Sequence, residues 1–119
     1  MPQKHSLGHW GEDWAVAFLK LKQFEILERN WRYRQKEIDI IAKKDNVIHI
    51  VEVKTRSSTF FGAPEEAVND TKSQNLTDAG EAYLEEKNLD SELQFDIIAI
   101  VATPYRKELS FIEDAFGGF

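Results

Sequence analysis

The sequence predicts an α/β fold in which a mixed β-sheet is flanked by helices. Apolar residues recur at helical spacing in two segments, at about residues 7–22 and 69–87. Between and after these segments lie stretches rich in Ile and Val, which are typical of strands. The chain has 119 residues, of which 42% are hydrophobic and 30% charged, and this fits one domain over residues 1–119.

The N-terminal half predicts one helix and three strands. The helix is expected from about Leu7 to Lys22, with Ser6 as its N-cap. Its apolar stripe comprises Leu7, Trp10, Trp14, Phe18 and Leu21. Strand-like segments follow at residues 24–33, 37–42 and 46–54, and a loop is expected at residues 57–64.

The C-terminal half predicts a second helix and one or two strands. The helix is expected from about Asn69 to Lys87, with Asn69 or Asp70 as its N-cap. The residues predicted on its inner side are Leu76, Ala79, Tyr83 and Leu84. Residues 93–102 are apolar at most positions, which indicates a strand covered on both faces. Residues 108–116 predict a short last strand near an edge of the sheet.

Composition excludes several classes of protein. The chain has no cysteine, so disulfides and thiolate metal sites are excluded. The first ten residues lack the apolar core of a signal peptide, and no apolar run approaches the roughly 18 residues of a membrane helix. We expect a soluble, cytoplasmic protein without a membrane partner.

Charge is distributed unevenly along the chain. The net charge is −6, but residues 1–60 hold 11 Lys/Arg against 8 Asp/Glu, whereas residues 61–119 hold 4 against 13. Basic residues concentrate in the segment 20–36, around Trp31 and Tyr33. One interpretation is a local basic face on an acidic protein, and the other is two ordinary solvated faces.

Residues 37–54 predict a β-hairpin that brings two carboxylates together. If residues 45–46 form a two-residue turn, Asp39 lies directly opposite Glu52, with Cβ atoms about 5 Å apart. A four-residue loop would instead place Glu37 opposite Glu52. In either register Asp39 and Glu52 share a face, because side chains alternate along a strand.

The two faces of this hairpin carry different side chains. One face is apolar except for a histidine, and it comprises Ile38, Ile40, Ala42, Val47, His49, Val51 and Val53. The other face comprises Asp39, Ile41, Ile48, Ile50, Glu52 and Lys54. Both faces are expected to be partly buried, so the charged residues stand where burial costs free energy.

A divalent cation would explain why Asp39 and Glu52 lie together. Two carboxylates at this separation repel, which raises the proton affinity of each. Oxygen ligands without Cys or a well-placed His favour Mg²⁺ or Mn²⁺ over Zn²⁺. Lys54 points in the same direction as Glu52 and could hold a phosphate or orient a metal-bound water. The alternative is an exposed strand end with a cross-strand ion pair.

Two further charged residues are directed inward by helical periodicity. Lys72 falls inside the apolar stripe of the second helix, although a lysine that snorkels from the edge of the stripe is the alternative. Glu12 lies near Val16 and could be directed at the sheet, although an acid that favours the helix dipole is the alternative.

The three histidines, at positions 5, 9 and 49, show no metal-ligand spacing. Because His49 lies on an apolar face, we expect it to be a hydrogen-bonded core residue and not a base.

Several motifs together resemble those of the YraN-like family of small uncharacterised bacterial proteins. In chain order they are GHWGEDWAVAFL, ILERNWRYRQKEIDIIA, HIVEVKTR, FGAPEEAV with Lys72, and QFDIIAI followed by EDAF. That family is similar to archaeal Holliday-junction resolvases and belongs with the PD-(D/E)xK nucleases. The resemblance spans nearly the whole chain and implies a restriction-endonuclease-like fold.

The resemblance also implies roles for individual residues. Positions matching the D…ExK pattern of these nucleases are Asp39, Glu52 and Lys54, and the glutamate of the first helix corresponds to Glu12. Asp39, Glu52 and the backbone carbonyl of Val53 would then bind metal, with Lys54 at the scissile phosphate. Glu12 would assist metal or water binding.

We therefore expect a Mg²⁺- or Mn²⁺-dependent endonuclease that acts on DNA, with branched DNA as one candidate substrate and a homodimer as one candidate assembly. Candidates for contact with nucleic acid are Arg32, Arg34, Arg56 and Lys72. Trp31 and Tyr33 could stack on bases, but packing of a strand explains them equally well.

The alternative function is a non-catalytic module of the same fold that binds nucleic acid or a protein partner. The acidic second half of the chain is the feature that favours this reading.

Overall fold

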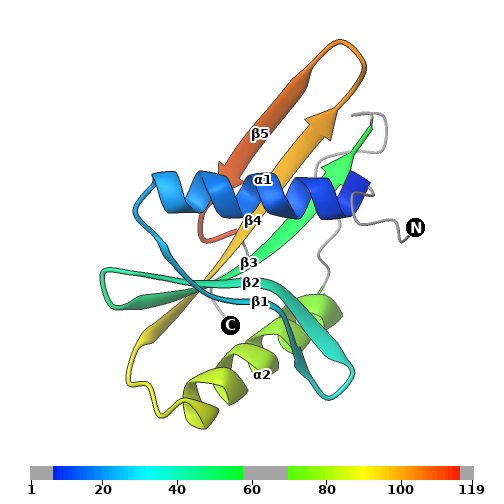
Figure 1. The fold of residues 1–119 in the computed structure, drawn as a ribbon. Helices are drawn as coiled ribbons and strands as arrows, with labels where there is room; N and C mark the ends of the chain where they lie inside the picture. Colours follow the sequence, from blue (N-terminus) through cyan, green and yellow to red (C-terminus); the bar gives the residue numbers. More distant parts are fainter. Residues whose placement is uncertain (1–6, 58–69, 116–119) are drawn as a thin grey trace, which may run out of the picture.

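The computed structural model describes residues 7–57 and 70–115 of the chain. Within these residues the predicted α/β class is confirmed, since a mixed five-stranded sheet is flanked by two helices (Figure 1). The helices are α1 (Leu7–Leu21) and α2 (Asp70–Glu86). The strands are β1 (Glu25–Tyr33), β2 (Lys36–Lys44), β3 (Val47–Arg56), β4 (Glu92–Ala102) and β5 (Lys107–Ile112). This architecture is compatible with a restriction-endonuclease-like fold.

A few expectations fall outside the described residues. They concern Ser6 and Asn69 as helix caps, His5, and all of the predicted 57–64 loop except its first residue. Neither described helix is long and apolar enough to cross a lipid bilayer.

The strands lie in the order β1-β2-β3-β4-β5. Only the β3–β4 pair is parallel, and the other three neighbouring pairs are antiparallel. A parallel pair needs a long crossover connection, and α2 forms part of it (Figure 1). β5 is at the edge of the sheet, as predicted from its weak apolar pattern.

The β2–β3 hairpin has the two-residue turn that the sequence indicated. Asp45 and Asn46 have φ angles of 52° and 62°, which is the left-handed conformation that such a turn requires at both positions. Ile41 pairs with Ile50 and Ile40 with Val51, so the predicted register is confirmed from Ile40 to Lys44, and the regular pairing ends one residue before Asp39. The four-residue alternative is wrong.

The two helices cover opposite faces of the sheet. The core under α1 contains Ile40, Ala42, Val51, Ile98 and Ile100, and the core under α2 contains Ile38, Ile41, Ile48, Ile50 and Phe95. β4 contributes to both cores, which confirms that it is covered on two sides. On α2 the inner side chains are the predicted ones, with Leu76, Ala79 and Tyr83 buried and Leu84 partly buried.

The buried side of α1 differs from the predicted stripe. Its fully packed side chains are Ala15, Val16 and Leu19, whereas Trp10, Trp14 and Phe18 are only partly buried. Leu21 is 80% exposed, so its assignment to the core was wrong. The reason is a close approach at Gly11, where an added Cβ would overlap the side chain of Thr55 on β3. Small residues therefore make the nearest contact, and the aromatic residues flank it.

One residue of β2 faces away from its predicted side. Ile38 packs in the α2 core with Ile41, and not under α1 with Ile40. The regular β2–β3 pairing ends at Ile40 and Val51, and on β1 the residue in register with Asp39, Asn30, has a φ of 52°. This local irregularity breaks the alternation of side chains at the position where the acidic residues meet.

Candidate active site

Asp39 and Glu52 meet where the β2–β3 ladder opens. The Asp39 carboxylate crosses to β3, where its Oδ2 accepts a hydrogen bond from the backbone N–H of Val53 at 2.9 Å. Glu52 precedes Val53 and is only 4% exposed. Asp39 is therefore fixed against the same short stretch of β3 that carries Glu52.

Burial disfavours the charged forms of both acids, and repulsion from Glu52 adds to this effect at Asp39. Burial, and then the charge of Glu52, raise the pKa of Asp39 to about 7. The hydrogen bond from Val53 opposes this shift without cancelling it. Burial likewise raises the pKa of Glu52, although nearby lysines lower it. The pair consequently has a high affinity for protons, and for any cation that can replace them.

Two lysines lie beside this pair. Lys72 on α2 places its Nζ 3.3 Å from Glu52 Oε1, so its charged end lies at the site while its side chain remains 35% exposed. Burial, and then the neighbouring charge of Lys72, lower the pKa of Lys54. Lys54 and Lys72 thus approach the same carboxylate from the sheet and from the helix.

The second oxygen of Glu52 has no hydrogen-bond partner among residues 7–57 and 70–115. This oxygen, Oε2, is buried. A buried charged oxygen without a partner costs free energy, and such a group in a native fold calls for an explanation such as an absent ion or water.

Glu12 of α1 reaches the edge of this site through β1. Asn30 Nδ2 donates to the two Glu12 carboxylate oxygens at 3.1 and 3.4 Å, and Arg29 lies 3.8 Å from Oε1. The Glu12 charge contributes to the raised pKa of Asp39, which indicates that the two are near each other. Glu12 is therefore directed at the sheet and does not act only on the dipole of its own helix.

The acids fit a hard divalent cation, with further ligands needed. In residues 7–57 and 70–115, no three Asp, Glu, His or Cys side chains form a metal centre by themselves. A buried and a partly buried carboxylate, both of raised pKa, and the unpartnered Glu52 Oε2 nevertheless match the oxygen ligands that Mg²⁺ and Mn²⁺ take. Mg²⁺ commonly uses one or two carboxylates and keeps several waters, so Asp39 and Glu52 suffice as its side-chain ligands.

The other basic candidates lie on or next to β1 and at the end of β3. Arg32 is exposed and pairs with Glu37 at 3.6 Å, and Arg34 lies over the ring of Tyr33 at 5.0 Å. These contacts are with residues of β1 and β2. Arg56 continues β3 two residues beyond Lys54, and its Nε is buried without a hydrogen-bond partner among the described residues.

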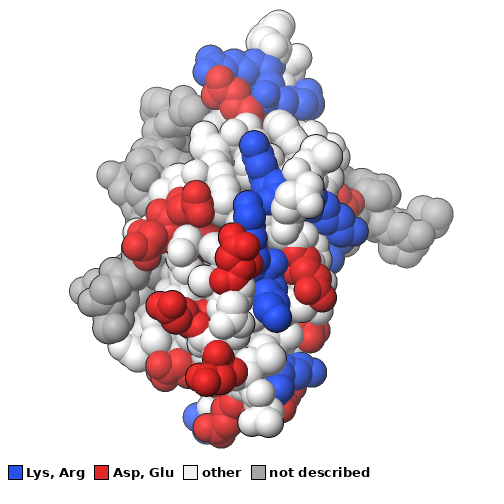
Figure 2. All heavy atoms as spheres, turned by 90° about the vertical axis from the view of Figure 1, so that its left-hand side faces the viewer, with Lys and Arg blue, Asp and Glu red and all other residues white. Residues whose placement is uncertain are grey.

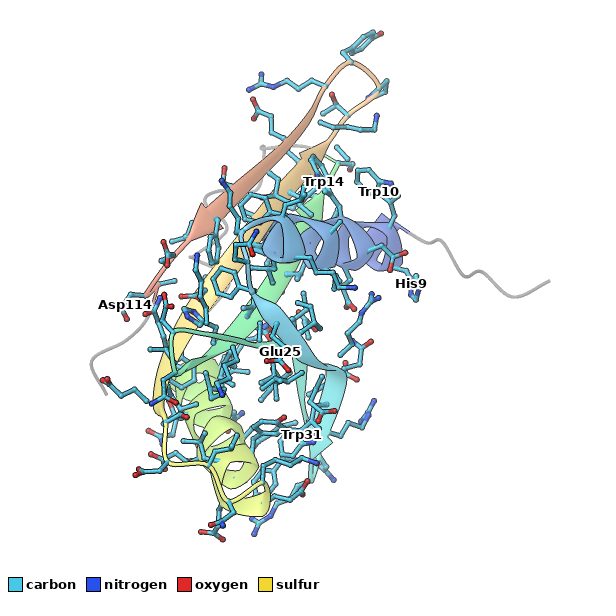
Figure 3. The ribbon with its side chains drawn as sticks, turned by 60° about the vertical axis from the view of Figure 1, so that its left-hand side comes forward. His9, Trp10, Trp14, Glu25, Trp31 and Asp114 are labelled. Carbon is cyan, nitrogen blue, oxygen red and sulfur yellow. The ribbon has the colours of Figure 1, made fainter. Side chains whose placement is uncertain are left out.

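Packing accounts for the aromatic residues of β1. Trp31 stacks with Tyr33 at 6.4 Å and meets Tyr83 of α2 edge-on at 5.1 Å, and Figure 3 shows it beside that helix. Both belong to the rim of the α2 core. Their role in strand packing therefore explains them without a stacked base.

Sequence reasoning missed the residues that support the site. Asn30 and Arg29 hold Glu12, and the Val53 amide holds Asp39. One signal could have indicated Asn30, because an Asn inside a strand pattern tolerates the left-handed conformation that it adopts.

The metal-free protein should lose stability as the pH rises from about 4 to about 7. The folded-state pKa of Asp39 is about 7 against 3.8 for the ordinary group, so the fold favours the protonated form. This contribution is fully present below about pH 4 and is lost as the pH rises through about 7. Urea unfolding in EDTA at about pH 5 and about pH 8 should differ by on the order of 1–3 kcal/mol more in the wild type than in Asp39→Asn. The same pH dependence in both proteins would contradict the assignment.

Comparison with known proteins gives a family and no activity. A family model described as "Uncharacterised protein family UPF0102" matches residues 11–100. The UPF0102 protein of Christiangramia forsetii is 46% identical over 116 residues, which cover 98% of each chain. The UPF0102 protein FP2501 of Flavobacterium psychrophilum is 45% identical over 119 residues and 100% of each chain. The UPF0102 protein of Syntrophomonas wolfei is 42% identical over 111 residues, 92% of this chain and 96% of the relative. These matches confirm the resemblance to an uncharacterised bacterial family that the motifs indicated.

Proposed function

The chain belongs to the UPF0102 family, and from the geometry of its buried acids we propose that it is a Mg²⁺- or Mn²⁺-dependent endonuclease that hydrolyses phosphodiester bonds in DNA. One observation carries the proposal. Glu52 is buried against Asp39, and in the described part of the chain one of its oxygens has no hydrogen-bond partner, while two lysines lie beside it. A purely structural ion pair would need neither the second acid nor the second lysine.

The acids would act as the ligands of the cation. Asp39 is held by the Val53 amide, so one of its oxygens is already oriented, and Glu52 offers Oε2. The Val53 carbonyl is the third ligand that the resemblance to PD-(D/E)xK nucleases implies. A bound divalent cation would supply Lewis acidity and an activated water.

The lysines would act on the substrate phosphate. Lys54 has a lowered pKa because it is partly buried and lies close to Lys72, so its ammonium group is poorly compensated without an anion. A phosphate in the site would supply that anion, and Lys54 would stabilise the charge that develops on it. Lys72 balances Glu52 in the metal-free protein, and Glu12 assists from the β1 side.

The proposed substrate is inferred from the basic side chains around the site and from the resemblance. Branched DNA is the first candidate, because the motif pattern is similar to that of Holliday-junction resolvases. Arg32, Arg34 and Arg56 are proposed to contact the phosphate backbone around the site, where contacts of this kind position a duplex without reading its sequence. A cytoplasmic location and a homodimer that engages two strands are part of the same proposal.

Replacing Glu52 by Gln is expected to reduce metal-dependent cleavage at least about 100-fold, because even residues that only orient a metal ligand contribute 10- to 100-fold. The assay uses four-way junctions, flaps and linear duplexes at low salt, with Mg²⁺ and with Mn²⁺. Gln has the size of Glu, so the fold should be retained.

Glu85→Gln is the matched control, because Glu85 is an exposed residue of the same type on α2. It should cleave as the wild type does. If the wild type cleaves none of these DNAs with either metal, the catalytic proposal is wrong.

The alternative proposal is a non-catalytic module that binds DNA or a protein. The acidic balance of residues 61–119 is the observation that favours it. Binding of the same DNAs should then weaken steeply with salt, with a log–log slope of about −0.9 for each phosphate neutralised. Retention of a partner at about 0.5 M salt would identify a protein and not a nucleic acid.

A further inference from the structure

A second cavity opens on the α1 side of the sheet. Its volume is about 570 Å³, within the range of small-molecule sites. Its lining comes from the end of α1, the β2–β3 turn, β4 and β5, and comprises Phe18, Lys22, Phe24, Lys44, Asp45, Val47, His49, Gln94, Phe111 and Glu113. None of the residues proposed for catalysis lines it.

The cavity contains a buried histidine whose orientation is fixed. His49 is 6% exposed, and its Nδ1 lies 2.6 Å from Oδ2 of Asp96, which is fully buried. The other Asp96 oxygen accepts hydrogen bonds from Gln94 Nε2 at 3.0 Å and from the backbone N–H of Asp114 at 2.9 Å (Asp114 is labelled in Figure 3). The expectation that His49 is a hydrogen-bonded core residue is confirmed, but this residue also borders an open space.

These hydrogen bonds determine which polar atoms remain for a ligand. A carboxylate only accepts hydrogen bonds, so His49 Nδ1 carries the proton of the bond to Asp96, and Nε2 is an acceptor when the ring is neutral. One N–H of the Gln94 side-chain amide donates to Asp96, which leaves its other N–H as a donor and its Oε1 as an acceptor. Both residues line the cavity, so it offers acceptors for N–H or O–H donors beside one amide N–H.

Aromatic rings form the apolar part of the lining. Phe111 meets Phe18 and Phe24 edge-on, with ring centroids 5.7 and 5.9 Å apart, and Phe24 meets His49 edge-on at 4.8 Å. Lys22 lies over the ring of Phe18 and Lys44 over that of Phe24, at 5.6 and 5.0 Å from the ring centres, so these two rings offer mainly their edges. A planar aromatic ligand can pack edge to face against such rings and bury its apolar surface.

Charge around the cavity is balanced. Two lysines and two acids line it, Lys22 with Lys44 and Asp45 with Glu113. Lys44 is held in place, because its Nζ donates to the Lys22 carbonyl at 2.8 Å and lies 5.0 Å from the centre of the Phe24 ring. Figure 2 shows the molecule from the left-hand side of Figure 1, with basic side chains in the centre of this face and acidic ones on both sides. A ligand with several negative charges gains little in such surroundings.

We propose that this cavity binds a neutral, flat nitrogen heterocycle of the nucleobase type, whose N–H groups donate to His49 Nε2 and Gln94 Oε1. The site does not depend on the proposed nuclease activity. His49 and Glu52 are three residues apart on β3, about 10 Å along the strand, and their side chains contact elements on opposite faces.

The test is a titration with guanosine and with adenosine, followed by NMR of the His49 imidazole and the Gln94 side-chain amide. Guanosine carries adjacent N–H donors on one edge and should shift both signals at millimolar concentration or below, with adenosine weaker. Guanosine triphosphate should bind no more than about threefold more tightly than guanosine, since the balanced lining gives its phosphates little additional attraction.

Val47→Phe is the variant that fills the cavity, and it should weaken guanosine binding at least tenfold without lowering the unfolding temperature of the fold. Val101→Phe, on a strand position that does not line the cavity, should bind guanosine as the wild type does. The proposal is overturned if neither nucleoside shifts the two signals, if Val47→Phe binds as well as the wild type, or if the triphosphate binds tenfold more tightly than guanosine.

Discussion

Asp39→Asn is expected to stabilise the metal-free protein at about pH 8 by on the order of 1–3 kcal/mol and to abolish its stabilisation by Mn²⁺. Ionised Asp39 is partly buried beside Glu52, and both burial and repulsion destabilise it. An Asn side chain removes the charge but retains an oxygen that can accept the Val53 N–H. Urea unfolding with EDTA and with a series of Mn²⁺ concentrations measures both effects.

In the same experiment the wild type should be stabilised by Mn²⁺. At a metal concentration about 100 times the dissociation constant, its free energy of unfolding should rise by about 2.7 kcal/mol. Asp90→Asn is the control, because Asp90 is exposed and should leave both quantities unchanged. If Asp39→Asn is less stable than the wild type without metal, or responds equally to Mn²⁺, the site has been assigned wrongly.

Asp96→Ala is expected to destabilise the protein by about 3–5 kcal/mol. Asp96 is fully buried and accepts hydrogen bonds from three groups, on His49, Gln94 and the backbone of Asp114. Removing it leaves these donors unsatisfied in the interior, and each buried donor without a partner costs about 1–3 kcal/mol. The midpoint of urea unfolding gives the loss directly.

Asp90→Ala provides the comparison for this substitution, since an exposed aspartate should change stability by less than about 0.5 kcal/mol. A loss below about 1 kcal/mol in Asp96→Ala would mean that the buried hydrogen bonds contribute little, and the structural role given to Asp96 would be wrong.

Local signals in the sequence predicted much of the fold. The turn at Asp45 and Asn46 determined the hairpin register, because few residue types accept two left-handed positions in succession. From that register alone Asp39 was expected opposite Glu52, and the structure has the register from Ile40 to Lys44. The inward direction of Lys72 followed from helical periodicity in the same way.

Features that depend on distant segments could not be predicted. His49 meets Asp96 because β3 and β4 pair in parallel across a long connection, and no local pattern sets that register. The buried side of α1 was predicted from its large apolar side chains. In the structure Gly11 makes the closest contact with the sheet, and the large aromatic side chains lie on either side of it. The expectation that side chains alternate strictly along β2 was also wrong at Ile38, where the β2–β3 pairing is no longer regular.

The Mn²⁺ anomalous signal in crystals soaked with this metal tests the central claim most directly. The account predicts a single strong peak between the carboxylates of Asp39 and Glu52, with the Lys72 ammonium displaced from Glu52 Oε1, and no such peak in Glu52→Gln crystals. A peak that is absent from the wild type, or that persists in Glu52→Gln, would contradict it.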